Sequence, residues 1–364
     1  MNIVNQLMFN YKNQPEKICL VQGDRVVTYG EFYKKVSNLK KYLEKNGVEE
    51  GTKVLVLSHM SIDLYITLYS IWSIGAVVCV IDEEYLKNDI QKFDFSKINV
   101  LIESTKFAIY SNMNEHLTNL EKRININIID FVEEDDEELE ITPVEGDFPA
   151  MHTYTLGKDG ITKIAERSHK FLEKQSEILQ ENLRYDSRDV ELSSIPLFAL
   201  TNIDIGITTV IADANFSDLM DSNQKKLINQ INNGKINRIL ASPGLLKLIA
   251  EYCMKKNMKC DRITKIFTRG GTIFLDTIYD LKNVFPNAKI IVLYGSIEAE
   301  PISELDINDI SMEDVENTKN GRGILVGKII GVEDCKIIKN MKEEIGEINE
   351  AVFQELQMGI RLIY

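Results

Sequence analysis

The sequence has little of what marks several protein classes. It contains five cysteines in 364 residues, and no two of them form a CxxC pair. An odd count without paired spacing argues against a disulfide framework or a zinc site and favours a reducing compartment. The opening residues, MNIVNQLMFNYKNQPEK, contain no basic segment followed by an apolar one, so no secretory signal is expected. We therefore expect a cytoplasmic protein.

Positive charge is also scarce. The 42 lysines and arginines stand against 56 aspartates and glutamates, which gives a formal net charge of -14. Because proteins that bind nucleic acids present basic faces to the phosphate backbone, this balance argues against a nucleic-acid partner. It does not exclude a nucleotide, because one lysine and a few backbone N–H groups are enough to hold a phosphate.

Long apolar runs are limited to one, LYITLYSIWSIGAVVCVI, which lies between Asp63 and Asp82. The run approaches the length of about 20 residues that spans a membrane. However, Ser70, Ser73 and Gly75 interrupt it, and its character changes at the glycine. We interpret it as a helix, a glycine and a buried strand, and we expect no membrane span.

Short β-rich runs alternate with helical patterns along most of the chain. The segment KICLVQGDRVVTY predicts a hairpin that turns at Gly23–Asp24, and YGEFYKKVSNLKKYLEKNG predicts an amphipathic helix. Further strands are expected at KVLVLSH, AVVCVID, INVLIES and ININIIDF, and Pro243–Gly244 predict a turn between a strand and a helix. A β-helix-β alternation of this length implies an α/β fold with a parallel sheet covered by helices.

The length and one acidic block suggest how the chain is divided. The block EEDDEELE, residues 133–140, carries seven carboxylates in eight residues and is interpreted as a solvated linker. We expect a first α/β subdomain over residues 1–140, a second over 141–320, and a small β subdomain over 321–364, where the predicted runs are short.

One loop resembles a site for phosphate. In YTLGKDGITKIAERSH, residues Thr155, Gly157, Gly160 and Lys163 follow a predicted strand. Glycines let backbone N–H groups converge on an anion, and the lysine adds a mobile positive charge. The spacing is not that of a GxxxxGK(S/T) loop. Taken alone, the stretch is compatible with either a phosphate loop or a plain surface loop.

A second segment, LYGSIEAEPIS at residues 293–303, ends a predicted buried strand. Ligands of α/β sheets bind at the carboxyl ends of strands, where an aromatic ring such as Tyr294 can stack on a base. A carboxylate such as Glu298 can hold Mg²⁺ near phosphates. The alternative is a strand-to-loop turn with a packed tyrosine and a solvated glutamate.

Together the two segments resemble the adenylate-forming superfamily, which includes acyl-CoA synthetases, peptide-synthetase adenylation domains and luciferases. YGSIEAEPIS is similar to the family's Tyr-Gly-x-Thr-Glu, and residues 155–169 align without gaps with its T-S-G-T-T-G-x-P-K-G-V-x-x-S/T-H. The segments TYGEF, PLFALTNIDIG, ASPGLL, TRGGTIF and GILVGK occur in family order. The resemblance implies the large N-terminal domain of such an enzyme: two helix-covered mixed or parallel sheets, a nucleotide cleft and a small C-terminal β subdomain.

The resemblance also implies an ATP- and Mg²⁺-dependent ligase that converts a small carboxylic acid to acyl-AMP and pyrophosphate. Whether CoA, a carrier-protein thiol or nothing then accepts the acyl group is left open. Carried over by position, the implied site residues are Thr155, Gly157, Gly160 and Lys163 at the phosphates, Gly270, Gly271 and Thr272 along the adenine, Tyr294 stacked on it with Gly295 and Ser296 beside it, Glu298 on Mg²⁺, and Phe198 at the wall of the acyl pocket. Lys163 and Glu298 are the expected catalytic residues.

The chain departs from the family pattern at several of these positions. Leu156, Lys158 and Asp159 replace loop hydroxyls, and Ile297 replaces a threonine. The sequence ends without the Tyr-x-x-Gly-Asp motif or the C-terminal domain that carries a further catalytic lysine. The chain would then be either a fragment of a longer enzyme or a short form to which a partner supplies that domain. The departures keep a second hypothesis open, a non-catalytic relative that retains the fold as a binding or scaffold protein.

Overall fold

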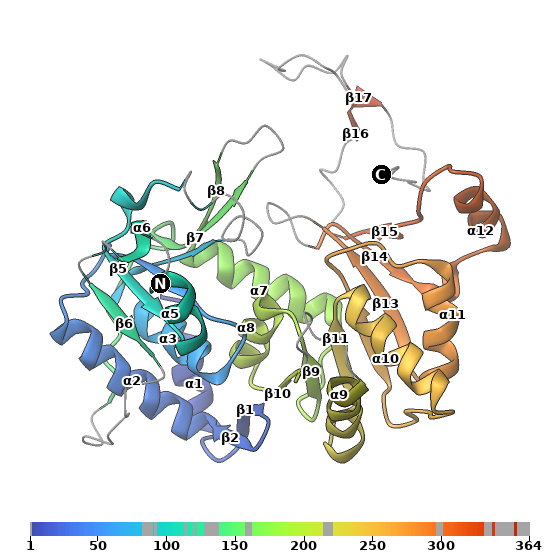
Figure 1. Cartoon of the computed structure of the whole chain (residues 1–364), viewed down its shortest axis with the longest axis horizontal. Coiled ribbons are helices and arrows are strands. Elements are labelled where there is room, and N and C mark those ends of the chain that lie inside the picture. Colours follow the sequence, from blue (N-terminus) through green and yellow to red (C-terminus); the bar gives the residue numbers. More distant parts are fainter. Residues whose placement is uncertain are drawn as a thin grey trace. The chain divides into compact units, whose positions relative to one another are not determined.

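The computed structural model describes residues 2–81, 90, 93–112, 115–118, 120, 122–126, 138–156, 162–213, 221–295, 301–330, 337–338 and 353–354. The chain divides into two compact units, Met1–Asp213 and Ala214–Tyr364, which we call unit 1 and unit 2. Both combine helices and strands, which confirms the α/β class (Figure 1). The boundaries expected at residues 140 and 320 stay predictions. Most of the acidic block lies outside the described residues.

Six strands of unit 1 form a mixed sheet in the order β6-β5-β3-β4-β7-β8. The pairs from β6 to β7 are parallel, and β8 runs antiparallel to β7. The bounds are β3 (Lys53–Leu57), β4 (Val77–Ile81), β5 (Val100–Glu103), β6 (Arg123–Asn125), β7 (Pro149–Leu156) and β8 (Thr162–Ser168).

Both faces of the central strands β3, β4 and β5 are buried, which explains their continuous apolar sequences. In β3, Val54 and Val56 belong to one core cluster, whereas Leu55 and Leu57 belong to another. Alternate side chains of a strand point to opposite faces, so a strand covered on both sides is apolar at every position. The first cluster also holds buried residues of α2 and α3, which pack against each other.

Four further strands of unit 1 lie in the order β9-β10-β1-β2. The predicted hairpin at Gly23–Asp24 is confirmed, because β1 (Ile18–Gln22) and β2 (Arg25–Thr28) pair antiparallel. The remaining elements of the unit are α1 (Asn5–Asn13), α2 (Tyr29–Lys45), α3 (Ile62–Ile74), η2 (Phe95–Lys97), α5 (Thr105–Asn112), α6 (Glu115–Thr118), α7 (His169–Leu183), β9 (Val190–Ser193), α8 (Pro196–Ile205) and β10 (Thr208–Ile211).

The long apolar run divides as its sequence predicts. Helix α3 begins after Ser61, whose side chain accepts the N–H of Leu64, and it ends at Gly75. Gly75 has φ +78°, a left-handed conformation that glycine adopts without the steric cost of a Cβ. The chain then continues as the buried strand β4. Within the part of the chain that the structure describes, no helix combines the length and apolarity needed to cross a bilayer.

Five strands of unit 2 pair in the order β11-β12-β13-β14-β15. The pairs from β11 to β13 are parallel, and the pairs from β13 to β15 are antiparallel. Its elements are α9 (Asp221–Asn233), β11 (Arg238–Ala241), α10 (Pro243–Lys255), β12 (Lys265–Thr268), α11 (Leu275–Val284), β13 (Lys289–Tyr294), β14 (Ser303–Asp306), η3 (Ile307–Asp309), α12 (Met312–Lys319), β15 (Lys328–Ile329), β16 (Ile337–Ile338) and β17 (Phe353–Gln354).

The turn predicted at Pro243–Gly244 is wrong. These residues form the first turn of α10, where Ser242 caps the helix by accepting the N–H of Leu245. Proline is favoured at the first helical position because its missing N–H would have no partner there. The serine before the proline is therefore the residue that marks the start of the helix.

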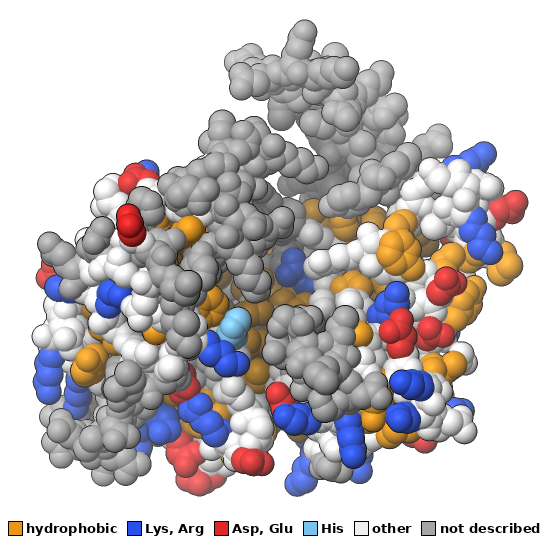
Figure 2. Space-filling view, in the orientation of Figure 1, with side chains coloured by type: hydrophobic (Ala, Val, Ile, Leu, Met, Phe, Trp, Pro, Cys, Tyr) orange, Lys and Arg blue, Asp and Glu red, His pale blue; other side chains and the backbone are white. Residues whose placement is uncertain are grey.

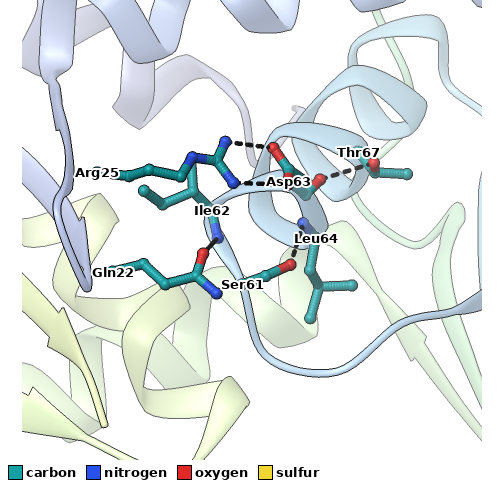
Figure 3. A network of polar contacts seen from close by, with 7 residues as sticks. All are labelled: Gln22, Arg25, Ser61, Ile62, Asp63, Leu64 and Thr67. Atoms are coloured by element: carbon teal, nitrogen blue, oxygen red, sulfur yellow. Dashed lines mark hydrogen bonds and ion pairs between the residues drawn. The ribbon is translucent and has the colours of Figure 1, made fainter. Parts of the chain in front are cut away.

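A polar network joins the β1–β2 hairpin to the start of α3 (Figure 3). The guanidinium of Arg25 donates two hydrogen bonds to the carboxylate of Asp63, at 2.7 and 2.8 Å. Gln22 accepts the N–H of Ile62 at 3.0 Å. The Arg25 side chain is 52% exposed but that of Asp63 only 9%, so the pair is bidentate and partly desolvated.

We expect Arg25→Ala to lower the free energy of unfolding of unit 1 by about 1–2 kcal/mol, because it leaves a nearly buried carboxylate without its charged donor. Arg25→Lys should lose less, since it keeps the charge but not the bidentate geometry. Urea unfolding followed by fluorescence of the single tryptophan, the buried Trp72 of unit 1, measures both. Equal losses in the two variants would contradict the bidentate role.

Candidate active site

The predicted phosphate loop is the connection of a β-hairpin. Thr155 lies near the end of β7 and Lys163 lies in β8, which corrects the expectation that both belong to a loop after the strand. The two residues are register partners. Side chains of directly opposed residues in an antiparallel pair lie on the same face. Thr155 and the exposed Lys163 therefore share one face of the hairpin. Gly157 and Gly160 lie outside the described residues.

The Ser168–His169 pair that closes this stretch has a structural role. The Ser168 side chain caps α7 by accepting the N–H of Phe171 at 3.2 Å. His169 is buried, and its Nδ1 accepts the backbone N–H of Ile3 at 3.3 Å. The serine thus bonds to the helix and the histidine to the N-terminal segment, so this pair does not form a nucleophile and base.

The predicted adenine residues meet at one cavity of unit 2. Gly270, Gly271 and Thr272 follow β12, Tyr294 ends β13, and Gly295 follows it. All five line a cavity of about 660 Å³. Strands β12 and β13 are parallel neighbours, so their carboxyl ends lie at the same edge of the sheet. Ser296 and Glu298 lie outside the described residues.

The backbone at Gly270 suits a flat ligand. Its φ is +84°, and a Cβ added there would meet no atom within 4 Å. The glycine is therefore required by the backbone conformation, and it leaves open space beside the peptide plane. Tyr294 is partly buried at the adjacent strand end, where its ring lines the same cavity.

Sequence reasoning missed the rest of this cavity. The other lining residues come from the segment between β12 and α11, the start of α11, β13, β14, the residue after η3, α12 and the segment before β15. They are Arg269, Ile273, Phe274, Leu275, Asp276, Ile278, Val292, Leu293, Leu305, Ile310, Asp314, Thr318, Lys319, Ile324, Leu325 and Val326. The motif GILVGK had pointed to the last three only as a landmark of the family.

Phe198, the expected wall of an acyl pocket, lies in α8 and is fully buried. Its helix is fixed by buried polar contacts. Asn202 donates to the Glu191 carboxylate at 2.7 Å, and Asn10 donates to the carbonyls of Ile203 and Asp204 at 2.9 and 2.8 Å. The role of Phe198 in binding an acyl group stays a prediction.

Among the described residues, no cluster of three or more histidine, cysteine or acidic side chains could hold a metal ion. This finding is compatible with Mg²⁺ carried by a nucleotide, because such an ion takes most of its ligands from phosphates and water and only one or two carboxylates from the protein. The assignment of Glu298 as that carboxylate stays a prediction.

The family model described as AMP-binding enzyme matches residues 9–349. Two curated relatives are olefin beta-lactone synthetases. The protein from Stenotrophomonas maltophilia (strain K279a) is 21% identical over 199 residues, which cover 54% of this chain and 35% of the relative. The protein from Xanthomonas campestris pv. campestris is 19% identical over 327 residues, covering 86% and 58%. The chain therefore spans only part of the length of these relatives.

Two solved structures share the fold. O-succinylbenzoate coenzyme A synthetase from Bacillus subtilis, in complex with AMP, superposes with a TM-score of 0.73 at 19% identity, over 92% of this chain and 66% of the other. VinN superposes with a TM-score of 0.72 at 15% identity, over 95% and 86%. Likeness at such identities concerns the fold alone.

Proposed function

The chain belongs to the AMP-binding enzyme family, and from this premise we propose that it is an ATP- and Mg²⁺-dependent acyl-activating ligase. In the proposed reaction, a carboxylate oxygen of the acid attacks the α-phosphorus of ATP. The bond from that phosphorus to the bridging oxygen breaks, pyrophosphate leaves, and acyl-AMP remains. The observation that carries the proposal is the cavity of unit 2, where two sequence segments assigned to adenine converge.

The base would lie between the ring of Tyr294 and the peptide planes of Gly270 and Gly271. An aromatic ring and a glycine backbone can flank a purine from its two sides, and the open space at Gly270 supports this fit. Thr272, also at the cavity, offers a hydroxyl for hydrogen bonding to the nucleotide. These groups would position the α-phosphorus for attack, which is the main task of a protein in such a transfer.

The phosphates would be held by Thr155 and Lys163, whose side chains share a face of the β7–β8 hairpin. A lysine charge near the transferring phosphate stabilises negative charge that spreads over its oxygens in the transition state. Mg²⁺, when bound, would neutralise charge on the leaving pyrophosphate, with Glu298 as the proposed protein ligand. Gly157, Gly160 and Ser296 would add backbone and hydroxyl donors.

The fate of the acyl group is part of the same proposal. A thiol of CoA or of a carrier protein would attack the acyl-AMP carbonyl and release AMP, giving a thioester. Because the chain spans 35% and 58% of the two curated relatives, we propose that a further domain, on this polypeptide or on a partner, completes that step.

A second candidate function, a non-catalytic binding or scaffold protein, is favoured by specific residues. Leu156, Asp159 and Ile297 stand where the family has hydroxyl groups. Each replacement removes a hydroxyl that could donate a hydrogen bond to a phosphate or to a group near it. Asp159 also adds a negative charge close to where pyrophosphate would lie.

Calorimetric titration of ATP, with and without Mg²⁺, separates the two candidates. The ligase requires Mg²⁺-dependent ATP binding and acid-dependent exchange of pyrophosphate into ATP, assayed over a panel of fatty and aryl acids. If the protein shows neither Mg²⁺-dependent ATP binding nor pyrophosphate exchange, even with a C-terminal domain added in trans, the ligase is rejected in favour of the scaffold function.

We expect Asp159→Thr to strengthen ATP binding or speed pyrophosphate exchange, and Lys158→Thr alone to weaken them. A hydrogen bond to a charged oxygen contributes about 1.5–3 kcal/mol, so one restored hydroxyl corresponds to roughly 10- to 150-fold. Both positions lie outside the described residues, and the expectation rests on the sequence alignment. An active protein in which Asp159→Thr changes neither quantity would show that this loop is not placed at the phosphates.

A further inference from the structure

Two cysteines of unit 2 contact each other through their thiols. Cys253 lies in the last turn of α10, and Cys260 lies in the connection from α10 to β12. The side chains form a hydrogen bond. Both residues are free cysteines, and neither lines the cavity of unit 2. The other described cysteines, Cys19 and Cys79, are buried in unit 1.

The backbone after α10 explains why the two thiols meet. Asn257 has φ +52°, a left-handed conformation that asparagine visits more readily than most residues. The N–H of Met258 donates to the carbonyl of Cys253 at 2.8 Å, a bond that ends the helix and turns the chain back beside it. The N–H of Cys260 then donates to the carbonyl of Val284, at the end of α11, also at 2.8 Å. Backbone contacts to two helices therefore hold the pair together.

The two thiols differ in acidity. Accepting the hydrogen bond from Cys253 lowers the pKa of the Cys260 thiol. Donating that bond raises the pKa of Cys253, and burial raises it further. The Sγ atom of Cys260 is also 3.8 Å from the amide oxygen of Asn232. A sulfur with thiolate character beside a protonated second thiol is the arrangement in which one cysteine attacks a disulfide and the other completes the exchange.

The segment that covers the pair is exposed and basic. Cys253 and Cys260 are only 0% and 3% exposed, but residues 254–257 and 259 are exposed, so local opening of this short connection would uncover Cys260. Figure 2 shows lysine and arginine side chains, in blue, at the surface of unit 2 over α9 and α10. Positive charge favours a thiolate and attracts anionic reagents. The exposed cations nearest in sequence to the pair are Lys255, Lys256, Lys259 and Arg262.

We propose that Cys253 and Cys260 form a reversible disulfide by exchange with a small anionic disulfide of the glutathione type. The thiolate of Cys260 attacks one sulfur of the reagent, whose S–S bond breaks and releases a small thiolate. Cys253 gives its proton to that thiolate, attacks the sulfur of Cys260 and releases the second small thiolate. The protein loses two electrons and two thiol protons, and the small disulfide becomes two thiols.

Peptide mapping of the full chain tests this site directly. The protein is equilibrated with oxidised and reduced glutathione at several ratios, quenched with acid, alkylated with N-ethylmaleimide in denaturant and digested with trypsin. Cleavage after lysine and arginine puts the two thiols on separate peptides, 248–255 and 260–262. At oxidising ratios mass spectrometry should find these peptides joined, and excess reduced glutathione should return both as maleimide adducts.

The cysteines of unit 1 are internal controls. Cys19 and Cys79 are buried, and burial raises the pKa of both thiols. They should react with oxidised glutathione at least about 10-fold more slowly than Cys260. Equal rates at all four cysteines would mean that oxidation follows unfolding of the whole chain, which overturns the inference.

Two serine variants separate the roles of the thiols. Cys253→Ser keeps a donor for the sulfur of Cys260, so the reaction should stop at a mixed disulfide of glutathione on peptide 260–262. Cys260→Ser should react at least about 10-fold more slowly, because the remaining thiol is buried and less acidic. Circular dichroism checks that both variants fold. Equal rates in the two variants would contradict Cys260 as the attacking thiol.

The charge of the reagent is tested at Lys259, which precedes Cys260. Lys259→Gln should slow the reaction with oxidised glutathione about 2- to 4-fold and leave the rate with uncharged hydroxyethyl disulfide unchanged. Lys247→Gln is the matched control, because Lys247 lies earlier in α10, with its ammonium 3.7 Å from the carboxylate of Glu251. An equal change with both reagents would reject the preference for an anionic disulfide. Peptides 248–255 and 260–262 that stay separate at every glutathione ratio would overturn the site itself.

Discussion

Replacing Lys163 by methionine is expected to lower acid-dependent pyrophosphate exchange by about 100- to 1,000-fold, the effect of removing one group that stabilises transition-state charge. Methionine keeps most of the length of the side chain and removes the ammonium, with its charge and its hydrogen-bond donors. Because Lys163 is exposed in β8, the free energy of unfolding should change by less than about 0.5 kcal/mol. Exchange kinetics and urea unfolding of the same preparation measure both quantities.

Lys170→Met is the matched control. Lys170 lies in α7, its side chain is 63% exposed, and its ammonium is 3.9 Å from the carboxylate of Asp147. This variant should exchange pyrophosphate at the parent's rate. If Lys163→Met also keeps a rate within a few-fold of the parent, Lys163 does not reach the phosphates, and the proposed role of the β7–β8 hairpin is wrong.

Asp204→Asn is expected to change how the stability of unit 1 depends on pH. Asp204 is buried in α8, where its carboxylate accepts the hydroxyl of Tyr69 at 2.7 Å. Burial raises the pKa of this carboxyl from 3.8 to about 7. The folded protein therefore holds a proton here at a pH where the unfolded chain has released it.

The direction in which the free energy of unfolding changes with pH follows from this difference in bound protons. Between the two pKa values the folded state binds more protons, so the free energy of unfolding falls as the pH rises. The fall is about 1.4 kcal/mol per pH unit, or about 4 kcal/mol over the whole interval. Asparagine does not titrate. The stability of Asp204→Asn relative to the parent should therefore rise by about 2 kcal/mol between pH 5.5 and pH 8, and then stay constant.

The comparison with the parent removes an opposing contribution from His169. Burial lowers the pKa of His169 from 6.5 to about 4, so this group makes the protein less stable as the pH falls through that interval. Both proteins contain His169, and its contribution cancels in their difference. Urea titrations followed by Trp72 fluorescence supply the values. A stability difference that is the same at both pH values would show that Asp204 ionises normally in the fold.

Much of the fold could be predicted because its elements are encoded locally. The alternation of KVLVL and AVVCVI with amphipathic helices indicated an α/β fold, and the predicted helix residues Phe32, Val36, Leu39 and Leu43 are all buried. Gly75 ended α3 where the pattern changed. Side-chain period and backbone preference act over a few residues, so they can be seen in the sequence before any long-range contact is known.

The order of motifs also indicated the family, and the segments with Gly270–Thr272 and Tyr294 were identified as neighbours before the structure showed them at one cavity. Local signals were less informative where a strand lacked an apolar pattern. The segment TKIAERS has no such alternation, and β8 exists because its backbone pairs with β7. That pairing, and not the spacing of the loop, puts Lys163 opposite Thr155.

The assembly of this cavity was decided by tertiary structure alone. Its walls come from the β12–α11 connection, the start of α11, β13, β14, α12 and residues 324–326, which are separated along the chain. Ile310, Ile324 and Leu325 are ordinary apolar residues in sequence, and nothing local distinguishes one that lines a cavity from one that fills a core. Which of them stays in contact with water depends on the tertiary packing around the cavity, and that packing is set by burial across the whole unit.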